Sequence, residues 1–438
     1  MKSIAEPSPR HGHPLHTTEV TRTAVEPKAG RPLLRLFFLA SITVSFLAAS
    51  SAPTPLYATY QAAWGFSALT TTVVFGVYAI AFLAALLTAG RLSDHIGRRP
   101  VLLAGIAGQV LALAVFVDAH SVAALLAARV VQGLATGGAI GAVGAGMLDS
   151  DPTRGAVANA TAPGLGTASG ALLSALAVQW LPAPTQLIYV VFAAVLVGQA
   201  LGVALLPETS PRAPGAWRSL VPQLALPAQT RRPLLAAAPV LFAVWALAGF
   251  YGSLGPALID HLVGSRSVVY GGLGLGILAG VASLTTYVLR ALPAPSVMLI
   301  GTTALTAGVA AALLSLWAAS SLGFFAGTAL AGVGFGAGFQ GGIRLVAPLA
   351  HPDQRAGVLS VLYTASYLGL GIPAVAAGFA VAKGGHLVAT SYEYGMAVIV
   401  LAVFATVNLI RLRTPTERSR SRPPWNRFHP DPRRQLCR

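Results

Sequence analysis

Long uninterrupted runs of apolar residues dominate the chain, and short polar segments separate them. A membrane core about 30 Å thick requires roughly 20 apolar residues in a helix. Backbone polar groups find no water in lipid, and the alternating pattern of barrel strands does not occur here, so the runs must be helices. Twelve membrane-spanning helices are predicted, at residues 36–60, 67–89, 101–119, 121–147, 155–181, 185–206, 234–259, 268–289, 296–317, 321–345, 356–381 and 391–411.

The composition agrees with this pattern and excludes a water-soluble protein. Hydrophobic residues make up 55% of the 438 residues and charged residues only 10%, whereas a soluble domain carries about 25% charge. The same values exclude disorder, which needs low hydrophobicity and high charge. A disulfide scaffold is excluded because Cys437 is the only cysteine. The fold class expected is an all-α integral membrane protein.

The net charge of +16 reflects membrane topology. Basic residues gather at the two ends and in alternate connections, and not on one folded face as nucleic-acid binding requires. The positive-inside rule places both termini in the cytoplasm of a multi-pass cell-membrane protein, with Arg266 and Lys383 outside. Residues 36–60 also resemble a signal peptide, but the apolar stretch exceeds the usual length of about 7–15 residues. We therefore expect contact with lipid and no binding of nucleic acid.

One connection, 207–233, differs from the others because it is long, polar and rich in proline and arginine. It divides the chain into an N-terminal six-helix bundle at 36–206 and a C-terminal one at 234–411. The basic tail 1–35 and the Arg-rich tail 412–438 are expected to be disordered and cytoplasmic. Two similar halves predict a structural repeat, and transporters often bind substrate near the membrane midplane where such repeats meet.

The strongest local motif is GRLSDHIGRRP, residues 90–100, between the second and third spans. Gly90 and Gly97 permit a tight turn and close helix contact. Asp94 is an acid among cations, and ion pairs of this kind form in one arrangement of two domains and break in the other. The segment is therefore a candidate conformational latch. The alternative is a basic loop that only fixes topology.

Two further motifs lie inside spans. Arg129 precedes Gln132 and Gly133 in the fourth span, and an arginine there costs at least about 2.5–3.5 kcal/mol on insertion scales. It must face a cavity, a partner or water, or else extend toward the outer end. The fifth span contains a proline and several glycines, which bend a helix and allow close packing. The residues of this helix-bend motif are Pro163, Gly164, Gly166 and Gly170.

On these residues the chain resembles the major facilitator superfamily (MFS), whose signature loop is Gly-x-Leu-x-Asp-x-x-Gly-Arg-Arg/Lys. The loop is matched at Gly90, Leu92, Asp94, Gly97, Arg98 and Arg99. The resemblance covers the twelve spans, the two halves and the central loop, and it implies two pseudo-symmetric six-helix bundles. It also implies a latch in which Asp94 faces Arg355 and exchanges with Arg98. Asp149 or Asp151 would join this network.

The resemblance extends to the motifs within spans. The Arg129-x-x-Gln132-Gly133 string is similar to a family motif implied in proton coupling. The string around Pro163 matches the family's antiporter motif only in part, because the terminal glycine pair is absent. The type most similar is the twelve-span drug/proton antiporter.

Carboxylates are scarce within the predicted spans. Asp260, beside His261, is the best candidate for the acid that carries a proton, although both residues alternatively face external water. Aromatic and amide side chains at cavity depth are candidate substrate contacts, because drug-sized sites are mostly apolar with a few polar anchors. Each alternatively packs within the protein. These candidates are Tyr57, Gln61, Tyr78, Gln109, Trp245, Tyr251, Gln340, Tyr363 and Tyr367.

The chain contains no phosphate-binding loop and no cluster typical of a metal site, so neither ATP hydrolysis, a cofactor nor a metal is expected. We predict a monomeric secondary transporter that works by alternating access. Proton-driven export of small, largely apolar compounds is favoured, and the alternative is an importer or facilitator of a metabolite such as a sugar or amino acid. An intramembrane enzyme would need paired catalytic residues at one depth. A static receptor has less need of a latch.

Overall fold

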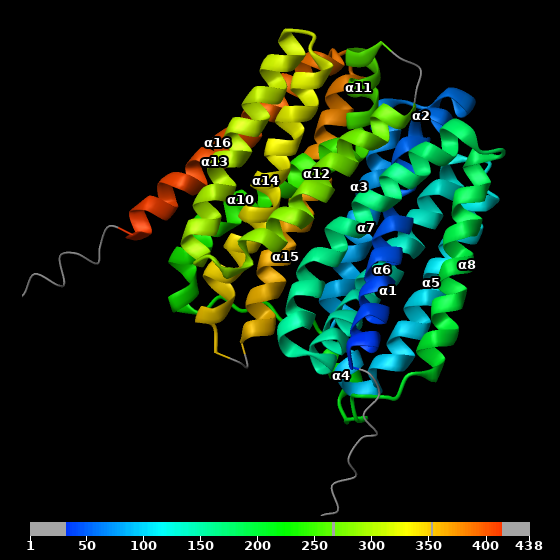
Figure 1. The fold of residues 1–438 in the computed structure, drawn as a ribbon, viewed down its shortest axis with the longest axis vertical. Coiled ribbons are helices and arrows are strands. Elements are labelled where there is room, and N and C mark those ends of the chain that lie inside the picture. The colour runs from blue at the N-terminus through cyan, green and yellow to red at the C-terminus, as the bar shows by residue number, and fades with distance from the viewer. Residues whose placement is uncertain (1–31, 265–267, 352–353, 414–438) are drawn as a thin grey trace, which may run out of the picture.

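The chain folds into a tall set of helices that stand side by side (Figure 1). The computed structural model describes residues 32–264, 268–351 and 354–413. Every regular element in these ranges is helical, and twelve helices are long and apolar enough to cross a membrane. The prediction of an all-α protein with twelve spans is confirmed. Within the spans lie α1 (Pro32–Ser51), α2 (Pro53–Trp64), α3 (Ala68–Ala89), α5 (Arg98–Val117), α6 (Val122–Ser150), α7 (Pro152–Trp180), α8 (Pro184–Leu205), α10 (Ala228–Ser253), α12 (Val268–Val288), α13 (Ala294–Trp317), α14 (Ser321–Val346), α15 (Arg355–Ala382) and α16 (Leu387–Arg413).

Three short helices mark the two ends of the molecule. At the bottom of Figure 1, α4 (Ser93–Ile96) lies close to the linker, residues 206–227, which contains α9 (Ala216–Ser219). We call this the linker end. At the opposite, far end, α11 (Gly255–Val263) continues beyond α10. Short 3-10 turns follow α12 at Leu289–Ala291 and α14 at Ala347–Leu349.

The helices form two groups that lie next to each other in Figure 1. Helices α1 to α8 make the N-bundle, and α10 to α16 make the C-bundle. The bundles meet where α3 packs on α15 and α7 packs on α12. Between α12 and α7, the Ser283 hydroxyl donates to the Thr161 carbonyl at 2.8 Å.

Equivalent helices of the two bundles are built alike, as α6 and α14 show. A serine before each helix, Ser121 or Ser320, accepts a hydrogen bond from the amide three residues later. Gly133 of α6 lies so close to α3 that a Cβ atom would stand 2.6 Å from the Tyr78 carbonyl oxygen. Gly332 of α14 makes the matching approach to α12, at 2.9 Å from the Leu278 oxygen. Small residues thus set the same close helix packing in both halves.

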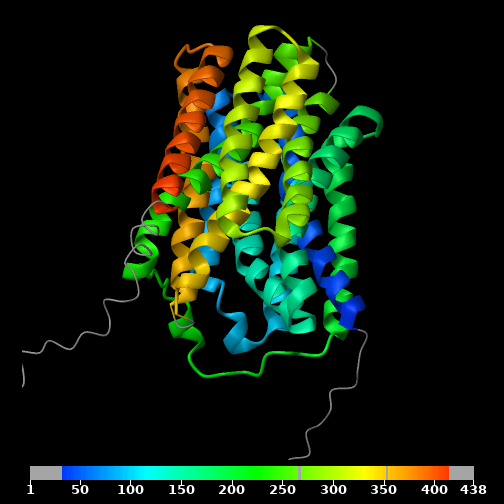
Figure 2. The ribbon, with the colours of Figure 1, turned by 60° about the vertical axis from the view of Figure 1, so that its left-hand side comes forward.

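The linker is shorter than the predicted segment 207–233. It leaves α8 at Leu206 and crosses beneath both bundles before α10 begins (Figure 2). Helix α10 starts at Ala228, so Arg231, Arg232 and Pro233 belong to the helix. Its first turn can extend beyond the lipid, where charged side chains are hydrated, and Pro233 in the second turn removes only one backbone hydrogen bond.

Prolines also divide two of the predicted spans. The first span is interrupted at Ala52, where α1 ends before Pro53. The seventh ends at Ser253 and not at residue 259, because Pro256 follows and α11 starts as a separate helix. A proline inside a helix lacks the N–H that would bond the carbonyl four residues earlier. Both interruptions therefore leave carbonyl oxygens available to other partners.

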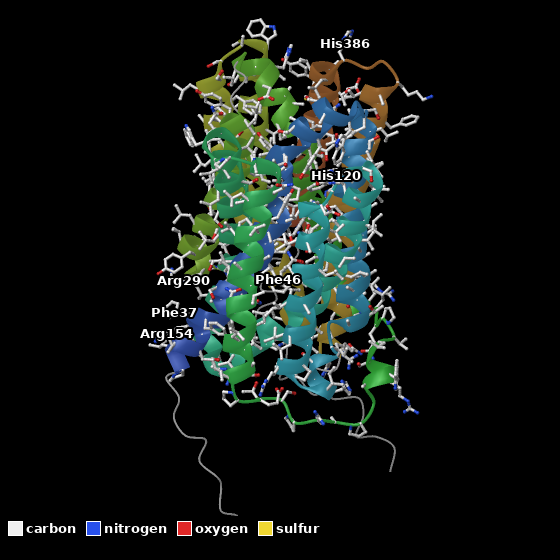
Figure 3. The ribbon with its side chains drawn as sticks, turned by 90° about the vertical axis from the view of Figure 1, so that its right-hand side faces the viewer. Phe37, Phe46, His120, Arg154, Arg290 and His386 are labelled. Carbon is white, nitrogen blue, oxygen red and sulfur yellow. The ribbon has the colours of Figure 1, made fainter. Side chains whose placement is uncertain are left out.

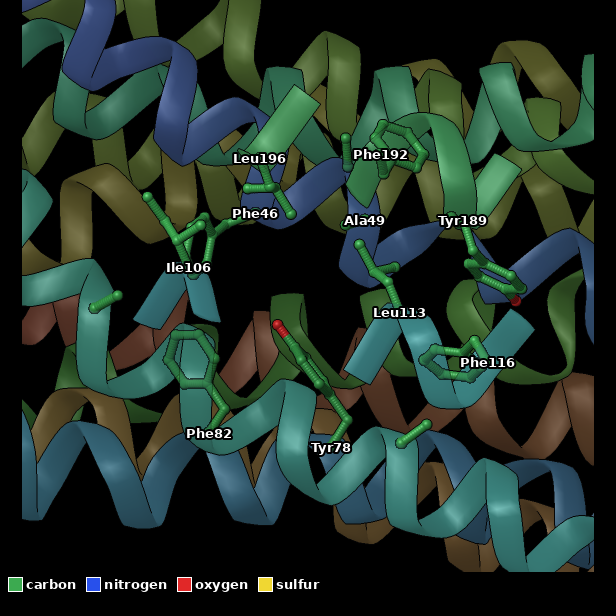
Figure 4. Close-up of a cluster of buried hydrophobic side chains, with 14 of the residues drawn as sticks. Phe46, Ala49, Tyr78, Phe82, Ile106, Leu113, Phe116, Tyr189, Phe192 and Leu196 are labelled. Carbon is green, nitrogen blue, oxygen red and sulfur yellow. The ribbon is translucent and has the colours of Figure 1, made fainter. Parts of the chain in front are cut away.

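Aromatic and aliphatic side chains fill the centre of the N-bundle (Figure 4). Phe46, Ile106 and Phe116 are buried there, and Phe116 stacks on Tyr189 with ring centroids 4.8 Å apart. Side chains also cover the outer faces of the helices, with Arg154 in the lower part of the view and His386 at the top (Figure 3). Most of the predicted tails, 1–35 and 412–438, lies outside the described residues, which begin at 32 and end at 413.

Candidate functional site

A buried arginine occupies the interruption of the first span. Because Pro53 has no N–H, the Ala49 carbonyl loses its helical partner, and the Gln132 side-chain amide donates to it at 3.2 Å. Arg129 Nη1 donates to the Ser50 carbonyl at 2.7 Å and to Gln132 Oε1 at 2.6 Å. The carbonyl oxygens at the break between α1 and α2 therefore accept hydrogen bonds from the polar side chains of α6.

Arg129 lies inside the protein, with 1% of its surface exposed. Its guanidinium carbon is 4.5 Å from the centre of the Tyr78 ring and 5.8 Å from that of Phe75. Its Nε makes no hydrogen bond. None of the ion pairs in the described part of the chain includes Arg129. The side chain is therefore a buried cation, and it does not extend to the outer water as the alternative interpretation required.

A polar ladder continues from Arg129 toward the middle of α6. The Thr136 hydroxyl lies 2.8 Å from the Gln132 carbonyl and 3.3 Å from Gln109 Oε1. Gln109 Nε2 donates to the Phe46 carbonyl at 3.5 Å, and the residue is fully buried. The ladder joins α5, α6 and α1. Gln109, a candidate substrate contact, thus has internal partners for its amide.

Aromatic rings connect the two bundles at the level of Arg129. Phe82 stacks on Tyr367 with ring centroids 4.4 Å apart, and Tyr367 lies 4.9 Å from Trp245. Tyr78 is 6.0 Å from Phe82 on the same face of α3, as Figure 4 shows. In the C-bundle, Trp245 contacts two phenylalanines of α14. We call this set the aromatic bridge; its members are Tyr78, Phe82, Tyr367, Trp245, Phe335 and Phe339.

Several buried polar atoms near the bridge have no hydrogen-bond partner. They include the hydroxyls of Tyr57 and Tyr78, the Trp245 indole Nε1 and Gln340 Oε1. Buried polar groups are almost always paired, so such atoms need an explanation. Tyr57 and Tyr78 are 2% and 7% exposed. The predicted contacts Tyr57, Tyr78 and Trp245 therefore keep free hydrogen-bonding capacity in the interior.

The other predicted substrate contacts are placed differently. The Tyr251 hydroxyl lies 2.6 Å from the Thr328 hydroxyl and is therefore paired. Gln61 is half-buried near the end of α2, where its carbonyl accepts from the Gly65 amide. Tyr363 is half-buried beside the N-bundle core. These three lie outside the aromatic bridge, and their contact with substrate stays a prediction.

The loop that carries the signature motif forms a charged network at the linker end. Arg98 pairs with Asp94, and its Nε lies 3.1 Å from Asp149 Oδ2. Arg98 Nη1 also donates to the Ser93 hydroxyl at 2.9 Å. Gly97 has φ +104°, a conformation that favours glycine. The tight turn brings Arg98 back over Asp94.

Glu208, which the sequence interpretation missed, binds the start of α5. Its carboxylate accepts from the amides of Arg98 and Arg99 at 2.9 and 3.0 Å, and from those of Thr209 and Ser210. Partial burial opposes ionisation of Glu208, but these four backbone N–H groups outweigh it and lower the pKa below the usual 4.5. The signal in the sequence was an acid directly after a span, able to reach the positive end of a helix.

The latch contacts expected for Asp151 and Arg355 are not formed by the described residues in this conformation. Of the two acids expected near Arg98, Asp149 joins it, whereas Asp151 faces its own helix and caps α7 by accepting from the amides of Thr153 and Arg154. Arg355 is exposed at the start of α15 and forms no ion pair with any described residue. All described partners of Asp94 belong to the N-bundle, because the α4 turn folds back on α5 and α6.

The remaining predicted residues lie on α7 and at the far end. Gly166 and Gly170 pack against α1, and Gly164 packs against α12 beside Ser283. The helix-bend motif therefore holds α7 between its own bundle and the other one. Asp260 lies on α11, outside the spans, where partial burial raises its pKa. Its role in coupling stays a prediction.

Comparisons with known proteins agree with this architecture. Residues 38–305 match the family model of the Major Facilitator Superfamily. The nucleoside transporter NupG, as a mutant, has a similar crystal structure, with TM-score 0.65 and 14% identity over 87% of this chain and 98% of that one. The human organic anion transporter MFSD10 (TETRAN) has TM-score 0.61 and 20% identity over 86% and 100%. No curated protein sequence shows significant similarity.

The twelve spans in two bundles define a multi-pass membrane transporter. The chain belongs to the Major Facilitator Superfamily. It is therefore a secondary transporter of small molecules and not an enzyme. At 14% and 20% identity, the two solved structures establish the shared fold and not a shared substrate.

Proposed function

We propose that this transporter works as a monomer in the cell membrane and exports small, aromatic, largely apolar compounds in exchange for protons. Both termini and the linker lie in the cytoplasm in this proposal. The aromatic bridge supports the substrate class, because stacked rings bind apolar aromatic compounds and leave few polar groups to be satisfied.

The contacts between the bundles support alternating access. On α3 and α15 they extend from Thr72 beside Gly378, near the far end, to the stack of Phe82 on Tyr367 near mid-span. Thr54 also donates to the Gly252 carbonyl at 3.2 Å, across the bundle boundary. These contacts favour a conformation that is closed at the far end. Rocking of the bundles would break them and bring the Asp94 loop toward α15.

A metabolite importer is less well supported. Sugars and amino acids present many polar groups, which require free amides and hydroxyls in the site. In the polar ladder, Gln109, Gln132 and Thr136 bind each other and the carbonyls of α1. The hydrogen-bonding capacity of the ladder is therefore largely used within the protein, and the few unpaired atoms near the aromatic bridge are left for a substrate with few polar groups.

Flux in proteoliposomes tests the proposal. Export of aromatic dyes and drugs should follow an imposed pH gradient and should stop when the gradient is collapsed. Tyr367→Ala should lower the rate roughly tenfold, because it removes ring contacts of about 0.5–1.5 kcal/mol each. Leu368→Ala, at an exposed position of the same helix, is the matched control and should leave the rate unchanged. Flux that ignores the pH gradient would contradict proton exchange.

Asp260 is the proposed proton carrier. Its raised pKa brings the carboxyl closer to the pH range in which protons exchange during transport. Asp260→Asn should uncouple flux from the pH gradient, whereas Asp118→Asn, at an exposed position, should not. Coupling that persists in Asp260→Asn would eliminate this residue.

A further inference from the structure

We infer that the preferred substrate carries one anionic group, such as a carboxylate, which binds Arg129 while its aromatic part lies on the aromatic bridge. This inference deepens the proposed function and rests on it for the claim that the bound compound is transported. The binding itself does not depend on the direction of transport or on proton exchange.

The first observation is an uncompensated buried charge. Arg129 is 1% exposed, and no ion pair in the described ranges neutralises it. A guanidinium stays protonated at any physiological pH. A buried charge is costly unless it is paired, and the Ser50 carbonyl and the Gln132 amide oxygen supply only partial negative charges. An anion would complete the pairing, whereas a cationic substrate would be repelled.

The second observation is the type of the unpaired atoms. Arg129 Nε–H and the hydroxyls of Tyr57 and Tyr78 are buried without hydrogen-bond partners. Arginine nitrogens can only donate, and a hydroxyl can donate as well. A carboxylate accepts about four hydrogen bonds and donates none. A set consisting mainly of donors beside a cation therefore fits an anionic acceptor.

The third observation is the position of the rings. The Arg129 guanidinium lies 4.5 Å from the Tyr78 ring centre, and from there the bridge passes through Phe82 and Tyr367 to Trp245. A compound with an acidic group and an aromatic body can therefore contact the cation and the rings together. Because the bridge crosses from one bundle to the other, separation of the bundles would expose both features to the same ligand.

Binding of two matched probes tests this inference. We would measure the affinity of 2-naphthoate and of the neutral 2-naphthamide for the purified full-length transporter in lipid nanodiscs, without a pH gradient. Hydrogen bonds to charged groups contribute about 1.5–3 kcal/mol, so 2-naphthoate should bind roughly 10- to 100-fold more tightly than the amide. Equal affinities, preference for the amide, or no binding of either probe would overturn the inference.

Variants test whether the residues of the proposed site cause the preference for 2-naphthoate over 2-naphthamide. Arg129→Gln should remove the preference, and the milder Tyr78→Phe should reduce it while leaving the ring contacts in place. Trp245→Ala should lower the affinities for 2-naphthoate and 2-naphthamide by the same factor. Arg344→Gln, which changes a cation at the linker end of α14, is the matched control and should preserve the preference. If Arg129→Gln does not fold, a preference that Tyr78→Phe leaves intact overturns the assignment.

Failure of this inference can be distinguished from failure of the proposed function. If 2-naphthoate binds through Arg129 but no pH gradient drives its flux, proton-coupled export is wrong and the anion site stands. If dyes are exported with the gradient while 2-naphthoate and 2-naphthamide bind equally, the proposed export stands and the anion site is wrong.

Discussion

Helices α6 and α14 hold equivalent places in the two bundles, yet of the two only α6 carries a fully buried charge. Arg129 and Thr328 each lie eight residues after the serine that caps their helix. Arg129 binds the backbone of α1 and keeps a free donor, whereas Thr328 is fully occupied by the Tyr251 hydroxyl and its own helix. The equivalent positions share a depth in the fold and differ in their chemistry.

Unlike Arg129 and Thr328, the glycines at equivalent positions of α6 and α14 make the same close contacts in both bundles. Cβ atoms at Gly137 and Gly336 would clash with the carbonyl oxygens of Phe82 and Ala282. The comparison shows that helix packing fixes the small residues in both halves. The side chains between them are free to specialise, and the cation of the interior is confined to the N-bundle within the part of the chain described.

The largest expected difference between the helices concerns transport. Arg129→Ala removes the cation assigned above to the anionic group of the substrate, and a hydrogen bond to a charged group contributes about 1.5–3 kcal/mol, so initial flux in proteoliposomes should fall roughly 10- to 100-fold. Thr328→Ala removes two neutral hydrogen bonds, to the Tyr251 hydroxyl and to the Phe324 carbonyl, and should change flux less than about threefold because neither bond faces the proposed site. Rates are compared at equal amounts of folded protein. Equal losses in the two variants would remove the functional asymmetry.

The shared packing predicts equal losses of stability. Gly137→Ala and Gly336→Ala each force a methyl group against a backbone oxygen, which should lower the free energy of unfolding by about 1–3 kcal/mol. Gly198→Ala is the control, because no atom lies within 4 Å of a Cβ atom there. Thermal unfolding in detergent measures all three variants. A loss in only one of the two helices would show that the halves are not packed alike.

The loops at the linker end extend the comparison. Asp94→Asn disrupts the ion-pair network of the N-bundle and should slow transport about tenfold without preventing membrane insertion. In the C-bundle, Arg344 Nη2 donates to the Leu292 carbonyl at 2.8 Å, a hydrogen bond between α14 and the loop that joins α12 to α13. Arg344→Gln should therefore have a smaller effect. Unchanged flux in Asp94→Asn would refute the latch.

Of the two loops compared at the linker end, only the loop of the N-bundle should lose contacts when the pH is lowered. The pKa of Glu208 is lower in the folded protein than its usual 4.5, so its hold on α5 is complete above pH 4.5 and is lost as the pH falls through the lower folded pKa. Hydrogen exchange of the Arg98 and Arg99 amides, corrected for intrinsic rates, should increase over this range. In Glu208→Gln, the corrected exchange rates of these two amides should not change with pH over this range. The Arg344 contact should not respond, because it contains no carboxylate.

The smallest expected effect lies beside Thr328. Tyr251→Phe removes one neutral hydrogen bond and should lower the free energy of unfolding by about 1 kcal/mol. Flux should be unchanged, because this pair is separate from the aromatic bridge. Thermal unfolding and flux measured on the same sample check both statements. A strong loss of flux would place Tyr251 among the substrate contacts after all.

The sequence alone determined the features that depend on local pattern. These features are the twelve runs of apolar residues, the loop at residues 90–100 and the unusual Arg129. They could be predicted because lipid requires a continuous apolar helix and penalises a charge within it. The same local rule misplaced the start of α10, where a charged first turn remains helical beyond the apolar run.

Tertiary structure decided which distant residues meet. It selected Asp149 over Asp151 as the partner of Arg98, brought Glu208 from the linker to the start of α5, and aligned Phe82 with Tyr367 across two bundles. Such partnerships depend on how helices far apart in the chain rotate and approach each other. Each helix has a similar apolar composition all round, so its sequence does not specify the face that meets a given neighbour.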